Sequence, residues 1–218
     1  MAYNEANTIA AVCSELLAAG ADELLVIDDG SQDGTASIAQ RMAASDSNVR
    51  VVSHSENLGL GMVYRSGFDN ATGDLLTFFP ADGQFPASII GDFRTVIGDA
   101  DLVLGYLEQP KRGIVGSLLS STERMVHRIL FGHVPRFQGV FMVRVAHLRV
   151  LPLAATGRGW TIVLEMIVRA QRAGWRIAHR PTPIRPRRSG KSKVNNWATI
   201  RSHLAQLVEL RRVLSRAS

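Results

Sequence analysis

Apolar and polar residues alternate along this chain in blocks that predict strands followed by helices. Apolar residues recur at helical spacing in four segments, residues 8–20, 34–45, 59–73 and 86–97. Short runs of mainly aliphatic residues lie between them, at residues 23–30, 48–54, 74–79 and 100–106. Strands that alternate with helices build a parallel sheet with helices on both faces. The pattern therefore predicts an α/β domain with a mostly parallel central sheet.

The chain opens on "AYNEANT" (residues 2–8), which has the character of a strand-to-helix loop although no strand precedes it. Such a start leaves a gap in the sheet, so we expect the first strand to be missing. Either N-terminal residues are absent or the protein tolerates a shorter sheet, and we favour the first. Met1 is followed at once by polar residues, which does not resemble a signal peptide.

Composition predicts one domain with a helical extension. The chain has 218 residues, of which 46% are hydrophobic and 20% charged, enough for one well-buried core. We divide it into a domain at residues 1–194 and a C-terminal helix at residues 195–218. No apolar stretch reaches the roughly 20 residues that span a bilayer. Cys13 is the single cysteine and is expected to fill the core, which suits a reducing cytoplasm.

The net charge of +6 lies mostly in the second half of the chain. The densest basic runs are residues 179–193 and 209–216. A basic patch binds phosphate, so the candidate partners are a nucleotide diphosphate, an anionic lipid surface or a nucleic acid. A solvated charged face is the alternative, and no nucleic-acid motif accompanies these residues.

Three loops at predicted strand ends carry candidate chemistry. "DDGSQDGT" (residues 28–35) places carboxylates where they can accept hydrogen bonds from a nucleobase or ribose, although Ser31 and Asp33 could serve only to cap the next helix. "NLGLG" (residues 57–61) is a glycine-rich turn that lets backbone approach a ligand closely. "FFPADGQF" (residues 78–85) ends an apolar run with an acid and an amide, as in many metal–diphosphate sites, but Pro80 stands where a second carboxylate would be useful.

The order of these motifs resembles glycosyltransferase family 2, in its dolichol-phosphate mannosyltransferase and polyprenyl-phosphate glycosyltransferase branch. The resemblance rests on a series that spans nearly the whole chain: "YNE", "DDGSQDGT", "NLGLG…YRSG", "TGDLL…ADGQFP", "GW…LEMIVRAQRAGWRI…P" and "PRRSGKSK". It implies a GT-A fold, a GDP- or UDP-hexose donor, an Mg²⁺ or Mn²⁺ ion and a polyprenyl or dolichol phosphate acceptor.

The resemblance also assigns roles by position. Asp82 matches the second acid of the family's D-x-D element, and Gln84 matches an amide that can join the metal shell. Glu165 matches a carboxylate in the helix before the basic loop. The residues that would bind the donor nucleotide are Tyr3, Glu5, Asp28, Asp29, Arg187, Ser192 and Lys193, with Gly190 in the same basic loop as the last three.

Three departures fall within the implied site. Pro80 replaces the first acid of D-x-D, and Arg136 stands where the family has an aspartate. The arginine expected after the strand at residues 100–106 is replaced, which leaves Lys111 and Arg112 nearby. A divalent ion needs only one or two protein carboxylates besides the substrate's phosphates, so Asp82 with Gln84 and a diphosphate could still hold the ion, with weaker affinity.

A lipid phosphate is already anionic, so it can attack the sugar without a base, and Arg136 could stabilise the departing diphosphate as a catalytic residue. We therefore expect a metal-dependent hexosyltransferase that uses a polyprenyl or dolichol phosphate. The alternative is a catalytically impaired homologue that binds a nucleotide or a partner protein.

The C-terminal segment predicts a basic amphipathic helix. Its apolar residues recur at helical spacing: Trp197, Ile200, Leu204, Leu207, Val208 and Leu214. The arginines lie largely elsewhere on the helix. Such a helix can lie in a bilayer interface, so we expect a peripheral protein at the cytoplasmic face of the membrane. The alternative is that the apolar face packs on the domain core.

Overall fold

The computed structural model describes residues 1–107, 125, 128–186 and 197–216, and it describes no side chains for residues 197–204 and 216. Its strands form two sheets. The smaller pairs β1 (Leu24–Asp28) with β2 (Val49–Ser53) in parallel, with Leu24 opposite Val49. The larger has the order β3 (Leu75–Thr77), β5 (Phe141–Arg144), β4 (Leu102–Tyr106) and β6 (Ile177–Pro181). The α/β architecture predicted from the sequence is confirmed.

The direction of β5 departs from a uniformly parallel sheet. This strand runs antiparallel to both β3 and β4, whereas β4 and β6 are parallel. The sequence pattern did not predict β5 or β6 as strands. β5 lies in the buried apolar run at residues 140–143, a strand signal that was overlooked, whereas β6 is only partly buried and gives no long aliphatic run.

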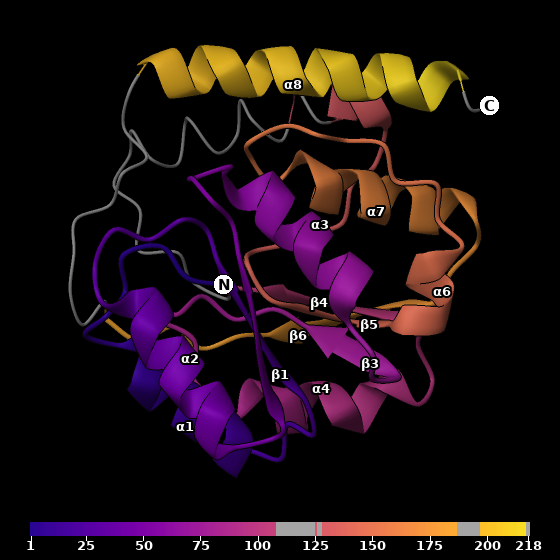
Figure 1. Ribbon diagram of the computed structural model, residues 1–218. Coiled ribbons are helices and arrows are strands. Elements are labelled where there is room, and N and C mark those ends of the chain that lie inside the picture. Colours follow the sequence, from indigo (N-terminus) through magenta and orange to yellow (C-terminus); the bar gives the residue numbers. More distant parts are fainter. Residues whose placement is uncertain (108–124, 126–127, 187–196, 217–218) are drawn as a thin grey trace.

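Helices cover both faces of the larger sheet (Figure 1). On one face lie α3 (Leu60–Asn70), α6 (Val145–Arg149) and α7 (Thr161–Arg172). On the other lie α1 (Ile9–Ala18) and α4 (Ile89–Ile97), and α2 (Thr35–Ser45) packs beside α1 and the smaller sheet. The last helix, α8 (Trp197–Arg216), lies across one end of the molecule over α7.

Apolar side chains from the two helical layers form separate cores on either side of the larger sheet. On the α3 and α7 side, Tyr64, Phe68, Phe78 and Phe141 make a tilted and edge-on aromatic cluster, with the Tyr64 and Phe78 ring centroids 4.7 Å apart. Burial raises the pKa of Tyr64. Cys13 is buried in the core beneath β1, as expected.

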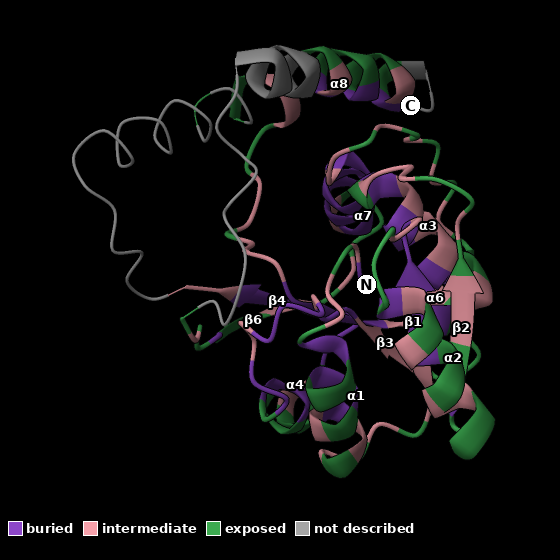
Figure 2. Cartoon of the chain, turned by 60° about the vertical axis from the view of Figure 1, so that its left-hand side comes forward, coloured by how far each residue is buried: buried purple, intermediate pink, exposed green. Residues whose placement is uncertain are grey.

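The apolar face of α8 packs against the domain. Leu207, Leu210 and Leu214 are at most 3% exposed and contact Leu164 and Val168 of α7. Figure 2 shows the buried side of α8 turned towards α7. The expectation that Leu207 and Leu214 face a membrane is therefore wrong, because the same hydrophobic face covers an apolar stripe of α7.

The remaining apolar positions of that helix are less constrained. Val208 is 44% exposed, and the side chains of Trp197, Ile200 and Leu204 lie outside the described part of the helix. Among the described residues, no helix combines the length and the apolar character needed to cross a membrane.

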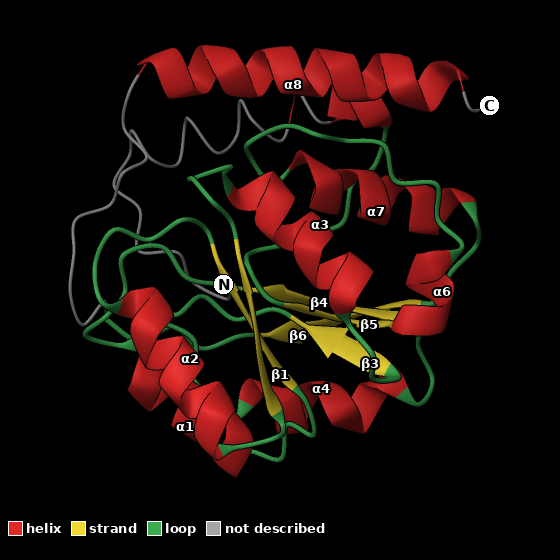
Figure 3. Cartoon of the chain, in the orientation of Figure 1, coloured by secondary structure: helices red, strands yellow, loops and turns green. Residues whose placement is uncertain are grey.

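The two sheets meet at a gap between β1 and β3, each an edge strand among the described residues (Figure 3). Ala2 pairs in parallel with the end of β1, since its N–H donates to Ile27 (2.9 Å) and its carbonyl accepts from Asp29 (2.9 Å). Met1 bonds in the same way to Phe79 and Ala81. Behind this two-residue bridge lies a cavity of about 330 Å³, lined by residues of β1, β3 and α1. The gap in the sheet that the sequence predicts is therefore present.

Candidate functional site

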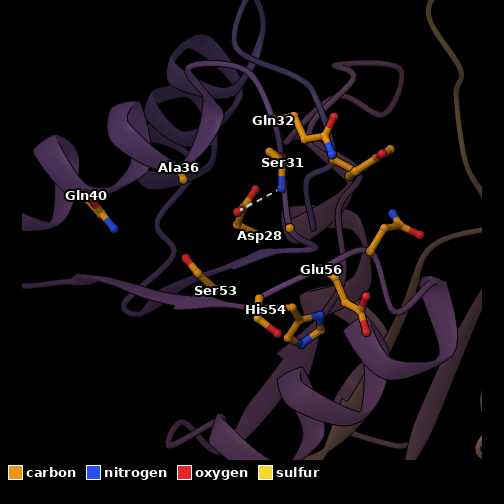
Figure 4. Close-up of a pocket in the computed structure, with 12 residues that line it drawn as sticks. Asp28, Ser31, Gln32, Ala36, Gln40, Ser53, His54 and Glu56 are labelled. Atoms are coloured by element: carbon orange, nitrogen blue, oxygen red, sulfur yellow. Dashed lines mark hydrogen bonds between the residues drawn. The ribbon is translucent and has the colours of Figure 1, made fainter.

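A polar pocket of about 340 Å³ opens at the carboxyl ends of β1 and β2 (Figure 4). Open α/β sheets bind ligands at this edge, because the loops that follow parallel strands converge there. Tyr3 and Asp28 line one part of the pocket, and the chain from Ser53 to Asn57 lines another. Of the side chains predicted to bind a donor nucleotide, the structure brings Tyr3 and Asp28 together here.

The carboxylate of Asp28 has a buried oxygen that is suited to bind a ligand. The residue is 2% exposed, and its Oδ2 accepts a long 3.4 Å hydrogen bond from the backbone N–H of Ser31. Its Oδ1 is buried and has no hydrogen-bond partner among the described residues. A buried carboxylate oxygen without a donor is costly, so this oxygen is suited to accept a hydrogen bond from a ligand.

The rest of the "DDGSQDGT" loop binds its own chain. Ser31 Oγ accepts the Asn4 N–H at 2.9 Å, and the Asp33 carboxylate accepts the N–H groups of Ala6 (3.2 Å) and Thr35 (2.9 Å). Against the opposing effect of burial, hydrogen bonds from Thr35 and Ala6 hold the pKa of Asp33 below its ordinary value. Of the two residues considered as caps of the next helix, only Asp33 binds its first residue, Thr35, whereas Ser31 binds Asn4 in the loop before α1.

Asp29 differs from its neighbour Asp28 in that it holds the glycine-rich turn. Its Oδ1 accepts the Leu58 N–H and its Oδ2 the Gly59 N–H, each at 2.9 Å. His54 Nδ1 lies 2.8 Å from Asp29 Oδ1, and the other ring nitrogen lies 2.8 Å from Ser66 Oγ on α3. Asp29 does not line the pocket among the described residues. Its contact with a nucleotide stays a prediction.

Glu5 is likewise engaged in the fold. Its N–H donates to Thr35 Oγ1 at 2.8 Å, and its carboxylate accepts from Thr8 Oγ1 at 3.1 Å. Glu165, the carboxylate noted in the later helix, is fully buried and accepts the N–H groups of Ala154 and Ala155. Both carboxylates therefore accept hydrogen bonds from their own chain.

The glycines of "NLGLG" accommodate another segment of this protein. A Cβ on Gly59 would lie 2.8 Å from the carbonyl oxygen of Arg158, and one on Gly61 would lie 1.8 Å from that of Gly157. Gly59 also has φ +91°, which side chains rarely adopt. A close backbone approach was the right expectation for this turn, but the approaching partner is the chain at residues 157–158.

The candidate metal loop follows β3. Asp82 is 8% exposed, and its Oδ1 accepts the Gln84 N–H at 3.0 Å across a turn whose Gly83 has φ +71°. The Phe85 ring packs against Gly139, three residues after the exposed Arg136. The segment that carries Arg136 therefore lies beside the loop that carries Asp82.

The same loop meets the chain that leads towards the basic run. The N–H of Arg185 donates to the Gln84 carbonyl at 2.7 Å, and its guanidinium pairs with Glu15 at 2.9 Å. Arg187, Ser192 and Lys193 lie outside the described residues, as do Gly190, Lys111 and Arg112. Their predicted roles remain predictions.

Asp82 and Gln84 offer the oxygen donors that Mg²⁺ and Mn²⁺ accept. In the described part of the chain, no group of three or more His, Cys, Asp or Glu side chains is arranged to hold a metal ion alone. A hard cation can take one or two protein ligands and complete its shell with water and substrate phosphates. The donor set thus fits an ion that binds together with a diphosphate.

Comparison with protein families gives a match over much of the chain. Residues 1–134 match the model described as glycosyl transferase family 2. Glycosyltransferase AglD of Haloferax volcanii is 31% identical over 89% of this chain, which spans 33% of that relative's length. The undecaprenyl-phosphate mannosyltransferase of Micrococcus luteus is 29% identical, with 88% of this chain and 84% of the relative covered. The dolichol-phosphate mannosyltransferase of Saccharomyces cerevisiae is also 29% identical, over 96% of this chain and 84% of its own length.

Solved structures share the fold. Glucosyl-3-phosphoglycerate synthase from Mycobacterium tuberculosis, in complex with Mn²⁺ and UDP-glucose, superposes with a TM-score of 0.71 at 24% identity. The alignment covers 96% of this chain and 76% of that protein. The complex of the same enzyme with UDP gives a TM-score of 0.69 at 23% identity, over 96% of this chain and 77% of that one. The fold is GT-A-like, as the sequence resemblance implied.

Proposed function

Because the chain belongs to glycosyl transferase family 2, we propose that it transfers a hexose from a nucleotide sugar to a polyprenyl or dolichol phosphate. One observation carries the proposal: a polar pocket at the strand ends contains a buried carboxylate oxygen of Asp28 without a donor among the described residues. This pocket suits the nucleoside of the donor. Met1 and Ala2 connect it to the Asp82 loop, where the diphosphate would lie.

Each part of the donor would meet a different loop. Asp28 would accept a hydrogen bond from the base or ribose, and Tyr3 would line the same pocket. Asp82 and Gln84 would hold Mg²⁺ or Mn²⁺, and such an ion neutralises negative charge on a leaving diphosphate when bound. Arg185, which belongs to the basic run at residues 179–193, donates its N–H to the Gln84 carbonyl, and Arg187, Ser192 and Lys193 of the same run would bind the donor's diphosphate.

The chemical step needs no base from the protein. An anionic oxygen of the lipid phosphate forms a bond to the anomeric carbon, and the bond from that carbon to the diphosphate oxygen breaks. The nucleoside diphosphate leaves with the electron pair. The protein's task is therefore to position both substrates and to stabilise negative charge. Arg136 is exposed, three residues before the Gly139 that packs against Phe85 of the Asp82 loop, and would supply positive charge there.

The acceptor places the reaction at a membrane surface. We propose peripheral association with the cytoplasmic face through the outer side of α8, where Val208 and Arg212 are exposed. The relative from M. luteus and the relative from yeast are both named for lipid-phosphate acceptors, which supports the same acceptor class for this chain.

A catalytically impaired homologue that binds a nucleotide is the second candidate. Pro80 in the metal loop and Arg136 in place of an aspartate favour it, since both remove negative charge from the proposed metal site.

Transferase assays separate the two candidates. The full chain would be incubated with GDP- and UDP-hexoses, a short polyprenyl phosphate and Mn²⁺ or Mg²⁺, and glycolipid would be detected by mass spectrometry. Metal-dependent glycolipid formation supports the enzyme. Nucleoside diphosphate binding without transfer supports the impaired homologue, and absence of both contradicts the nucleotide pocket itself.

A further inference from the structure

The glycine-rich turn that walls the pocket is held from outside by Arg158. This side chain donates from Nη2 to the Asn57 carbonyl at 2.7 Å and to Asn57 Oδ1 at 2.6 Å. In return, the Arg158 carbonyl accepts the Gly61 N–H at 3.2 Å. Asn57 itself lines the pocket. Arg158 and Asn57 are 101 residues apart in sequence, so this brace is a purely tertiary contact.

Asp29 holds the same turn from the opposite side. Its two carboxylate oxygens take the N–H groups of Leu58 and Gly59, as described above. The turn is thus fixed between the end of β1 and the segment around Arg158. Replacement of Gly59 or Gly61 by a larger residue would push the turn away from the segment around Arg158, because both glycines contact backbone of residues 157–159.

The segment around Arg158 is in turn fixed by α8. Gln206 Oε1 accepts the Gly159 N–H at 3.3 Å and the Thr161 hydroxyl at 3.2 Å. A Cβ on Gly157 would lie 2.4 Å from the same oxygen, so the segment and α8 are in close contact. Figure 1 shows α8 crossing this end of the molecule, above α3 and α7.

Contacts therefore run without interruption from α8 to the pocket wall. Gln206 fixes residues 157–161, Arg158 fixes Asn57, and Asn57 lines the pocket. A binding site that is already held in its bound shape loses less conformational entropy when the ligand arrives, which raises affinity.

We propose that Arg158 and Gln206 are positioning residues for the nucleotide pocket, through which the docked C-terminal helix raises affinity for a nucleoside diphosphate. The inference rests on the proposed function, because the pocket must take the donor nucleotide. Neither residue touches the reacting atoms. Both act through the glycine-rich turn.

Calorimetric titration of the full chain with UDP and with GDP, in the presence of Mn²⁺, tests Arg158. Arg158→Ala should weaken binding about fivefold, equivalent to about 1 kcal/mol, since it removes a charge-assisted pair of hydrogen bonds. Arg149→Ala is the matched control, because Arg149 also donates to a backbone carbonyl, that of Ala71 at 3.1 Å. The control should lower thermal stability without changing nucleotide affinity.

Substitutions of Gln206 test the other end of the same series of contacts. Gln206→Glu keeps an oxygen acceptor for Gly159 and Thr161, whereas Gln206→Leu removes it at similar size. The Leu variant should bind about threefold more weakly, and the Glu variant should bind as the wild type does. In the double variant Arg158→Ala with Gln206→Leu, the fold-loss of nucleotide affinity should be smaller than the product of the two single losses, because both residues act through the same series of contacts.

The outcomes distinguish this inference from the function on which it rests. A folded Arg158→Ala or Gln206→Leu protein that binds nucleotide as tightly as the wild type overturns the positioning role alone. A wild-type protein that binds neither UDP nor GDP contradicts the proposed function and the inference with it. If Arg149→Ala lost as much nucleotide affinity as Arg158→Ala, the loss would reflect lower stability in general, and the inference would also be overturned.

Discussion

Neighbouring residues of the same chemical type have different functions at this site. Asp28 and Asp29 are adjacent carboxylates, yet Asp28 has an unpaired oxygen among the described residues while Asp29 accepts the Leu58 and Gly59 N–H groups. Strand geometry explains the difference, since successive side chains point to opposite faces. Asp82 is a third case, because one of its oxygens already closes the turn at Gln84.

The metal proposal predicts opposite effects for two substitutions in the loop. Asp82→Asn keeps the Oδ1 that accepts the Gln84 N–H but removes the negative charge, so it should abolish metal-dependent binding of a nucleoside diphosphate. Pro80→Asp adds a second carboxylate and should preserve or strengthen it. Calorimetry with Mn²⁺ and nucleoside diphosphate measures both, and EDTA-treated samples serve as the baseline. Unchanged binding by Asp82→Asn would remove Asp82 from the metal site.

Helix α8 shows how one amphipathic element can satisfy two interpretations. Its apolar stripe packs on α7, with Arg211 donating to the Ile129 and Leu130 carbonyls, while its outer side carries exposed Arg212. An apolar helical face is attracted equally by lipid and by an apolar protein surface, so periodicity alone cannot choose between them. Here Leu164 and Val168 provide the partner surface.

We predict that the α8 interface contributes substantially to stability. Leu210→Ala removes a side chain that is 3% exposed, and should lower the free energy of unfolding by roughly 2–5 kcal/mol. Val208→Ala, on the 44% exposed position of the same helix, should cost about 0.5 kcal/mol or less. Urea denaturation followed by circular dichroism measures both. Equal small losses would mean that α8 is not stably docked in solution.

On the scale of the whole molecule, the basic charge is unevenly distributed along the chain. The net charge is +6, and the dense basic runs lie towards the C-terminus. The candidate donor pocket lies at the ends of β1 and β2, and α8 crosses the same end of the molecule, where Gln206 contacts the segment that braces the pocket wall (Figure 1). This arrangement would let a cationic surface meet an anionic membrane while the pocket stays open to the nucleotide.

Membrane association should therefore be electrostatic in character. Vesicle co-sedimentation should rise with the fraction of anionic lipid and fall with salt, because each basic residue near the surface contributes about 1 kcal/mol. Arg212→Ser should reduce binding, whereas Arg41→Ser on α2, away from α8, should not. Binding that is independent of anionic lipid and salt, or equal loss in both variants, would contradict this membrane surface.

Much of the fold follows from local sequence pattern. Three features depend on residues close together in the chain: the alternation of strands and helices up to residue 106, the glycine-rich turn, and the gap in the sheet. Short-range periodicity and turn chemistry report such features directly. The ordered motifs likewise identified the family, because several specific residues recur in one sequence.

Only the tertiary structure decided which surfaces those elements meet. It placed β5 antiparallel to its neighbours, covered the apolar face of α8, assigned the approach at Gly59 and Gly61 to residues 157–158, and separated the tasks of Asp28 and Asp29. Each of these depends on partners far apart in sequence, such as the Arg158 and Asn57 pair. Periodicity determines which side of an element is apolar, whereas the partner is set by packing the whole chain into one dense core.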